Sequence, residues 1–135
     1  MNPFKILVVD DEIDVFVMTK IVLKRLKHKG REIDIHYTDC GTDAIEFLKY
    51  HNDVGLVLLD IVMESENAGY EVVDYLRNEK KNDKTSIYIR TGYSGAVPTE
   101  YMHLVRGIDG YISKVEQTAE VLNGLVCESI DQYYS

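Results

Sequence analysis

Several short apolar segments of the sequence end in residues that could carry out phosphoryl-transfer chemistry. Asp10 and Asp11 follow ILVV, Asp60 follows LVLL, Thr91 follows SIYIR, and Lys114 follows GYIS. A carboxylate directly behind a buried apolar run is costly to desolvate unless it is paired, binds a metal or does chemistry. Carboxylates brought close together would also repel one another, and a divalent cation between them relieves that repulsion. The acids therefore predict a metal site.

Mg²⁺ is the cation that suits these acids, because it takes one or two carboxylates, keeps several waters and leaves room for phosphate oxygens. With the metal bound, the Asp60 carboxylate becomes a candidate nucleophile that holds a phosphoryl group as an aspartyl phosphate. Lys114 could pair with one phosphoryl oxygen, and the Thr91 hydroxyl could donate to another. Each of these residue types thus has a role in one reaction.

These residues can meet only if the segments before them form neighbouring strands. Apolar runs alternate with apolar residues at helical spacing along the whole chain, which predicts five strand-helix units. Such units form a parallel sheet with helices on both faces, and ligands bind outside the carboxyl ends of its strands. The expected strands are 4–9, 33–37, 56–59, 86–90 and 110–113. The expected fold class is therefore α/β, a parallel sheet covered by helices on both faces, with the site at one edge.

The helices between the strands are predicted from their apolar faces. The first is expected to bury Val15, Met18, Val22 and Leu26, and to end in a basic C-terminal turn at residues 24–31. The other expected helices have apolar positions within 44–48, 72–76, 101–105 and 122–130.

Length and charge narrow the possible functions. The 135 residues predict one domain, spanning 1–135, and the net charge of −8 argues against a nucleic-acid groove. Cys40 and Cys127 are isolated thiols, no segment is long enough to span a membrane, and the start lacks a signal peptide, so we expect a cytoplasmic protein.

Four motifs, ILVVDDE, LVLLD, IRTG and DGYISK, together resemble the receiver domain of two-component response regulators, over essentially the whole chain. The resemblance implies a doubly wound, flavodoxin-like parallel sheet of five strands in the order 2-1-3-4-5. It also implies an Mg²⁺ site and a phosphoacceptor. The implied metal ligands are Asp10, Asp11, Asp60 and the backbone carbonyl of Val62, and the implied phosphorylation residues are Asp60 as acceptor, Thr91 as switch hydroxyl, Lys114 as phosphate partner and Tyr111 as switch aromatic.

The resemblance also implies partners. Receivers accept phosphate from a sensor histidine kinase and act on an output domain or downstream protein. They are not enzymes beyond assisting their own phosphorylation and dephosphorylation. Many dimerise through the surface expected here from 101–105, 110–113 and 122–130, and no nucleic acid or membrane is implied. The segments LLDIVMESENAGYEVVDYLRNE and YISKVEQTAEVL resemble receivers that precede HD-GYP phosphodiesterase domains for cyclic-di-GMP.

Departures from the family pattern leave other functions open. Glu64 and Val115 occupy places where many receivers have proline, and the segment 63–70 is one residue longer than usual. A degenerate receiver that acts as a phosphorylation-independent interaction module is the main alternative. A second acid two residues after Asp60 would favour a metal-dependent phosphatase, but Val62 stands at that position. A flavodoxin-like cofactor protein would need a phosphate-binding loop, and VVDDEID is too acidic for one.

Overall fold

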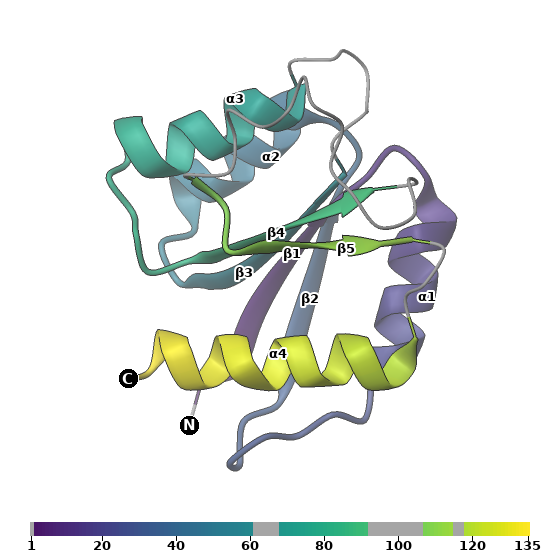
Figure 1. Cartoon of the computed structure of the whole chain (residues 1–135). Coiled ribbons are helices and arrows are strands. Elements are labelled where there is room, and N and C mark those ends of the chain that lie inside the picture. Colours follow the sequence, from purple (N-terminus) through teal and green to yellow (C-terminus); the bar gives the residue numbers. More distant parts are fainter. Residues whose placement is uncertain (1, 61–67, 92–106, 115–117) are drawn as a thin grey trace.

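A computed structural model describes residues 2–60, 68–91, 107–114 and 118–135. The sheet has five parallel strands in the order β2-β1-β3-β4-β5, which confirms the predicted fold class and order (Figure 1). The strands are β1 (Phe4–Val9), β2 (Ile33–Thr38), β3 (Val54–Asp60), β4 (Ser86–Thr91) and β5 (Gly110–Ser113). The helices are α1 (Ile13–Leu23), α2 (Gly41–Tyr50), α3 (Ala68–Asp74), which continues into the π-helix η1 (Tyr75–Glu79), and α4 (Ala119–Tyr133).

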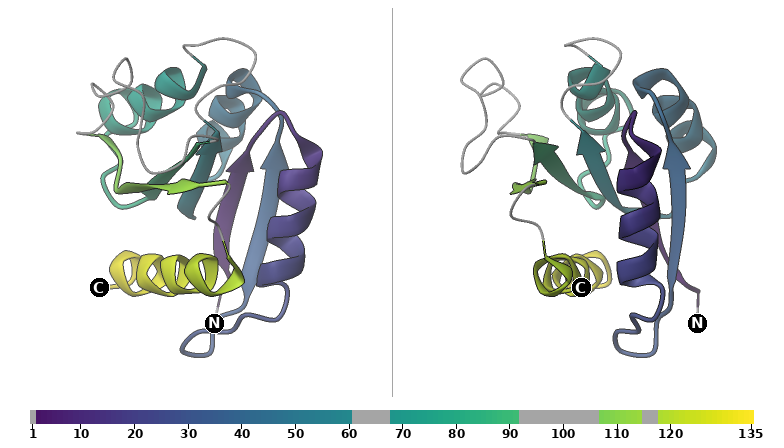
Figure 2. Two further views of the ribbon diagram at one scale, coloured as in Figure 1. Left: turned by 45° about the vertical axis from the view of Figure 1, so that its right-hand side comes forward. Right: turned by 90° about the vertical axis from the view of Figure 1, so that its right-hand side faces the viewer.

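The helices cover the sheet in two layers, each with its own apolar core. One core lies between the sheet and α2 and α3, and the other between the sheet and α1 and α4 (Figure 2). Side chains alternate between the faces along each strand, so Leu56 and Leu58 enter the α1 and α4 core, while Val57 and Leu59 enter the other. All seven residues of β3 are buried, because both faces of the strand are covered.

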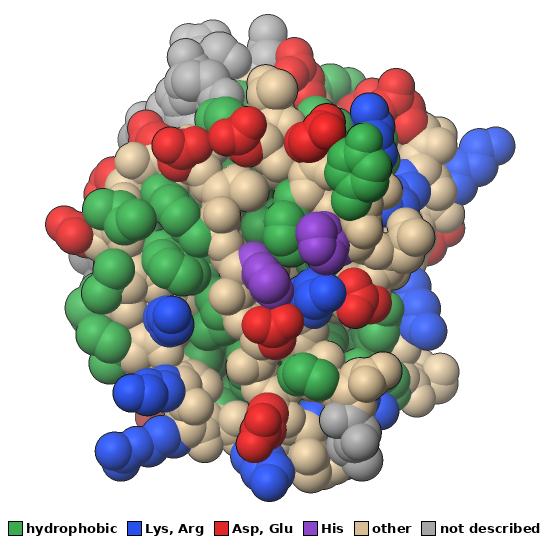
Figure 3. Space-filling model, turned by 180° about the vertical axis from the view of Figure 1, so that it is seen from behind, with side chains coloured by type: hydrophobic (Ala, Val, Ile, Leu, Met, Phe, Trp, Pro, Cys, Tyr) green, Lys and Arg blue, Asp and Glu red, His purple; other side chains and the backbone are tan. Residues whose placement is uncertain are grey.

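The buried face of α1 differs from the predicted one. Thr19 and Leu23 are fully buried, whereas Met18, expected in the core, is 60% exposed. The helix IDVFVMTKIVL has apolar residues on nearly every side, so apolar spacing could not identify the face that packs. Apolar side chains accordingly gather on the outside of the molecule over α1, on the left of Figure 3; the exposed residues are Ile13, Val17, Met18 and Ile21.

The basic segment 24–31 was also predicted wrongly. The first helix ends at Leu23, and the chain then forms an antiparallel bridge between His28 and Arg31. Their backbones exchange hydrogen bonds of 3.1 and 2.9 Å. Lys29 and Gly30, at φ 51° and 83°, make the turn between them. Glycine reaches this left-handed conformation at little steric cost, which explains a tight turn instead of a helical one.

The pairing of β1 with β3 contains an irregularity at Gly55. Lys5 pairs with Val54 and Ile6 pairs with Leu56, so Gly55 is an extra residue in β3. The ring of Phe4 covers it so closely that a Cβ atom at Gly55 would lie 2.1 Å from Phe4 Cε1. The absence of a side chain at this position therefore allows β1 and β3 to approach.

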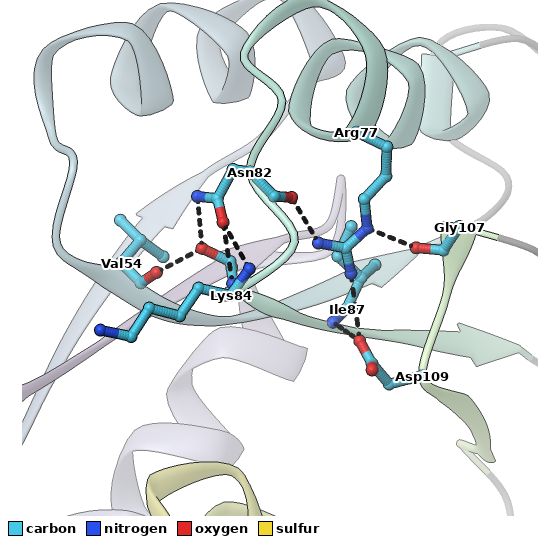
Figure 4. A network of polar contacts seen from close by, with 8 residues as sticks. Val54, Arg77, Asn82, Lys84, Ile87, Gly107 and Asp109 are labelled. Atoms are coloured by element: carbon cyan, nitrogen blue, oxygen red, sulfur yellow. Dashed lines mark hydrogen bonds and ion pairs between the residues drawn. The ribbon is translucent and has the colours of Figure 1, made fainter. Parts of the chain in front are cut away.

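A polar network holds the start of β4 against the segment that leads into β5 (Figure 4). Arg77 donates to the carbonyl oxygens of Gly107 at 2.9 Å and Asn82 at 2.7 Å, and to Asp109 Oδ2 at 3.1 Å. The same Asp109 oxygen accepts from the Ile87 backbone nitrogen at 2.8 Å. One carboxylate thus joins η1, β4 and the entry to β5.

We expect Asp109→Ala to lower the free energy of unfolding by about 2 kcal/mol, because it leaves the Ile87 N–H and one Arg77 N–H without their acceptor. Urea unfolding followed by circular dichroism measures the change. Asp83→Ala is the control, since Asp83 is an exposed acid before the same strand, and it should change stability by less than about 0.5 kcal/mol. Equal effects of the two substitutions would contradict this role for Asp109.

Two further expectations involve segments that the structure does not describe. The helix expected at 101–105 and the longer segment 63–70, apart from its last three residues, lie outside the described residues. No helix among the described residues is both long and apolar enough to cross a membrane.

Candidate functional site

The site begins with Asp10, which follows the last residue of β1. Its side chain is fully buried. Asp10 N donates to the Thr38 carbonyl at 3.2 Å, and its own carbonyl accepts from the Tyr37 hydroxyl at 2.7 Å. Its Oδ1 accepts from the Glu12 backbone nitrogen at 2.9 Å. These bonds fix the chain between β1 and α1 and hold the carboxylate at the carboxyl edge of the sheet.

Lys114 joins the ends of three strands. Its Nζ lies 3.0 Å from Asp10 Oδ2 and 3.4 Å from Asp60 Oδ2. Asp60 is the last residue of β3, is 5% exposed, and lies next to β1 in the sheet. Lys114 directly follows β5. The structure therefore brings together Asp10, Asp60 and Lys114, which are three of the residues predicted to meet at this edge.

The two acids keep Lys114 charged. Burial disfavours its ammonium form and is the largest single influence, but the hydrogen bond to Asp10 and the charges of Asp60 and Asp10 outweigh burial together. The net result raises the pKa of Lys114 above its usual value. Because that value is already far above neutrality, Lys114 presents a positive charge to both carboxylates at physiological pH.

The acids at the end of β1 fit a divalent cation. Asp10, Asp11 and Glu12 each offer one ligand oxygen, and these atoms lie within 4.8 Å of one another. Apart from the Lys114 ammonium, 3.0 Å away, the buried Asp10 Oδ2 has no partner among the described residues. Oxygen donors of this kind suit Mg²⁺, which keeps part of its water shell at such sites. Asp11 and Glu12 are exposed, so they leave room for those waters.

Arg90 is a buried cation that sequence reasoning missed. Its side chain is 0% exposed on the α1 side of the sheet, and its Nη2 donates to Thr19 Oγ1 at 2.7 Å. Its Nε and Nη1 have no hydrogen-bond partner among the described residues. Arg90 pairs in register with Asp60. The only signal in the sequence is the arginine that ends the otherwise strand-like run SIYIR.

Burial is the largest influence on the pKa of Arg90. It lowers the pKa of Arg90 to about 10, and the negative charges of Asp10 and Asp60 oppose that change. The guanidinium consequently stays charged at neutral pH, as arginine does in proteins generally. Asp10 and Asp60 thus have two cations near them, Lys114 at the sheet edge and Arg90 inside the fold.

Three other predicted residues are placed less completely. Thr91 is the last residue of β4 and pairs with Ser113 of β5, but its side chain lies outside the described part of the molecule. Val62 is outside the described residues altogether. Tyr111 is in β5 with 51% of its surface exposed. The predicted functions of all three stay predictions.

The chain is similar to known proteins in sequence and in fold. The model of the response regulator receiver domain family matches residues 6–125. A receiver domain protein (CheY-like) from Methanospirillum hungatei superposes with a TM-score of 0.75 at 23% identity, covering 98% of this chain and 97% of that one. The chemotaxis protein CheY4 of Vibrio cholerae gives a TM-score of 0.72 at 21% identity, covering 94% and 98%. These two likenesses concern the fold.

A longer relative is also similar in sequence. The 3'3'-cGAMP-specific phosphodiesterase 2 of Vibrio cholerae is 30% identical over 132 residues, which is 98% of this chain and 25% of that protein. The chain therefore spans about a quarter of the length of this relative.

Proposed function

Because the chain belongs to the response regulator receiver domain family, we propose that it is the phosphoacceptor of a two-component phosphorelay and takes its phosphoryl group on Asp60. The observation that carries this proposal is the Lys114 ammonium between the buried carboxylates of Asp10 and Asp60, at 3.0 and 3.4 Å. A cation in that place suits an acceptor carboxylate that gains phosphoryl charge.

In the proposed reaction, an Asp60 carboxylate oxygen attacks the phosphorus of a phosphohistidine on a sensor histidine kinase. An O–P bond forms on Asp60 while the N–P bond breaks, and the histidine nitrogen keeps the electron pair. Such a transfer depends mainly on alignment and on neutralising the charge of the phosphoryl oxygens. Lys114 supplies a positive charge beside one of these oxygens, and we assign a second hydrogen bond to the Thr91 hydroxyl.

Asp10 and Asp11 are the proposed Mg²⁺ ligands, together with Asp60 and the Val62 carbonyl. When bound, Mg²⁺ supplies positive charge to phosphoryl oxygens and fixes their orientation. Asp10 is held by its backbone bonds before any ion arrives, and its Oδ2 meets only the Lys114 ammonium among the described residues, which supports a place in the ligand set.

The consequence of phosphorylation is signalling instead of turnover. A phosphoryl group brings about −1.5 to −2 charge and strong acceptor oxygens, which bias a surface between two states. We assign the switch to Thr91 and Tyr111, whose exposed ring is available to a partner. The proposed dimer surface combines residues 101–105, β5 and α4. In a longer parent protein, the proposed output is hydrolysis of a cyclic dinucleotide, in line with the phosphodiesterase relative, and the proposed location is the cytoplasm.

The test is intact-protein mass spectrometry after incubation with acetyl phosphate and Mg²⁺. We expect one phosphoryl adduct, formed when Asp60 attacks phosphorus and acetate leaves. Removal of Mg²⁺ with EDTA should suppress the adduct by about a hundredfold or more, because the metal neutralises much of the phosphoryl charge. Hydroxylamine should remove the adduct, since it cleaves acyl phosphates but leaves phosphoserine intact.

A folded protein that gains no adduct from acetyl phosphate or from any phosphorylated kinase would contradict this function. It would instead favour the degenerate receiver that binds its partner without phosphorylation. An adduct that resists hydroxylamine would place the phosphoryl group on a hydroxyl side chain and exclude Asp60.

A further inference from the structure

Arg90 occupies an unusual position for a charged side chain. Its side chain is fully buried, and Thr19 Oγ1 of α1, a neutral hydroxyl, accepts its one identified hydrogen bond. That hydroxyl donates its own proton to the Val15 carbonyl at 2.7 Å, so it is fixed as an acceptor for Arg90. A buried guanidinium with two nitrogens unbonded among the described residues is costly unless negative charge lies nearby.

The nearby negative charge belongs to the acid site. Arg90 pairs in register with Asp60, and both Asp10 and Asp60 act electrostatically on it. The two carboxylates carry two negative charges, and Lys114 and Arg90 carry two positive ones. The buried part of the site is therefore neutral before any metal or phosphoryl group arrives.

We infer that Arg90 is an internal counter-charge of the acid site formed by Asp10 and Asp60. Its positive charge weakens Mg²⁺ binding to the unphosphorylated protein and stabilises the phosphorylated form. A divalent cation brought to Asp10 and Asp11 is repelled by the fixed guanidinium. A phosphoryl group on Asp60 adds negative charge that the guanidinium attracts. Low local dielectric makes both effects larger than they would be in water. Arg90 acts through the carboxylates, so it is a positioning and tuning residue.

This inference rests on the proposed function, since it concerns the Mg²⁺ site. Calorimetric titration with MgCl₂ tests it without phosphorylation. We expect Arg90→Met, which keeps the length and removes the charge, to bind Mg²⁺ about tenfold more tightly than the wild type. Arg90→Lys retains the charge and should bind Mg²⁺ within about twofold of the wild type.

Two substitutions at Thr19 separate charge from packing. Thr19→Asp places a carboxylate against the guanidinium, neutralises it in place, and should tighten Mg²⁺ binding in the same direction as Arg90→Met. Thr19→Val removes the hydrogen bond but leaves the charge, so Mg²⁺ affinity should not change even if the protein loses stability. This pair decides the question even if Arg90→Met fails to fold.

The inference is overturned if Thr19→Asp and a folded Arg90→Met bind Mg²⁺ as the wild type does, or if Thr19→Val tightens binding as much as Thr19→Asp. Failure of the proposed function looks different. If neither the wild type nor any variant binds Mg²⁺, then the metal site and the role of Arg90 in it are both wrong. If binding is normal but insensitive to Arg90, only the counter-charge is wrong.

Discussion

Asp60→Asn will fold and will gain no phosphoryl adduct from acetyl phosphate and Mg²⁺. The amide nitrogen and neutral oxygen that replace the carboxylate cannot act as the nucleophile, so the loss should be complete within detection, at least about a thousandfold. The fold should persist, because an amide of the same shape fills the buried space, and Lys114 keeps its shorter contact with Asp10. Intact-protein mass spectrometry measures the adduct, and thermal unfolding verifies the fold.

A matched control excludes a general effect of lost charge. Asp14→Asn removes one exposed carboxylate from the first turn of α1, close in sequence to the site. We expect it to gain the adduct at a rate within about threefold of the wild type, because an exposed charge is strongly screened. An adduct that forms as well on Asp60→Asn as on Asp14→Asn would show that another residue is the acceptor.

Gly55→Ala is expected to lower the free energy of unfolding by about 3 kcal/mol. The new Cβ would lie 2.1 to 2.8 Å from three ring atoms of Phe4. Phe4 is fully buried, and its ring packs edge-on against Tyr133 and Tyr134, so it cannot move aside without disturbing α4. Overpacking of a closed core has a cost of this size. Urea unfolding measures it.

Gly124→Ala provides the control for this substitution. Gly124 lies inside α4, and a Cβ there would meet nothing within 4 Å. The change should stabilise the protein by about 0.5 to 1 kcal/mol, since alanine restricts the unfolded chain and favours the helix. A second variant, Gly55→Ala with Phe4→Leu, should recover part of the loss. If Gly55→Ala alone is as stable as the wild type, the close approach of β1 and β3 does not depend on the missing side chain at residue 55.

The sequence predicted the sheet and the edge where its polar residues meet because both follow from chain-wide patterns. Fully apolar runs indicate strands covered on both faces, and parallel strands place Asp10, Asp60 and Lys114 at one edge. The buried face of α1 could not be predicted, because apolar residues on all sides give no preferred face. The turn at Lys29 and Gly30 depends on positive φ angles, and the basic residues around it gave no indication of them.

Arg90 was missed for a related reason. An arginine at the end of a strand is usually solvated, so the burial of Arg90 depends on its contact with Thr19 of α1. This tertiary contact joins two residues that are 71 positions apart in the sequence. The π-helix that follows α3 likewise has no counterpart in apolar spacing.

The extra residue at Gly55 also limits how the gene for this protein can change length. Beyond it, strict alternation sends Leu56, Leu58 and then Asp60 toward α1 and α4. An insertion or deletion of one codon between Leu56 and Asp60 would turn the Asp60 side chain toward α2 and α3. A codon gained or lost before Gly55 could instead be taken up where the register already shifts. Length variation in natural descendants of this gene should therefore be found before Gly55 and not between Gly55 and Asp60.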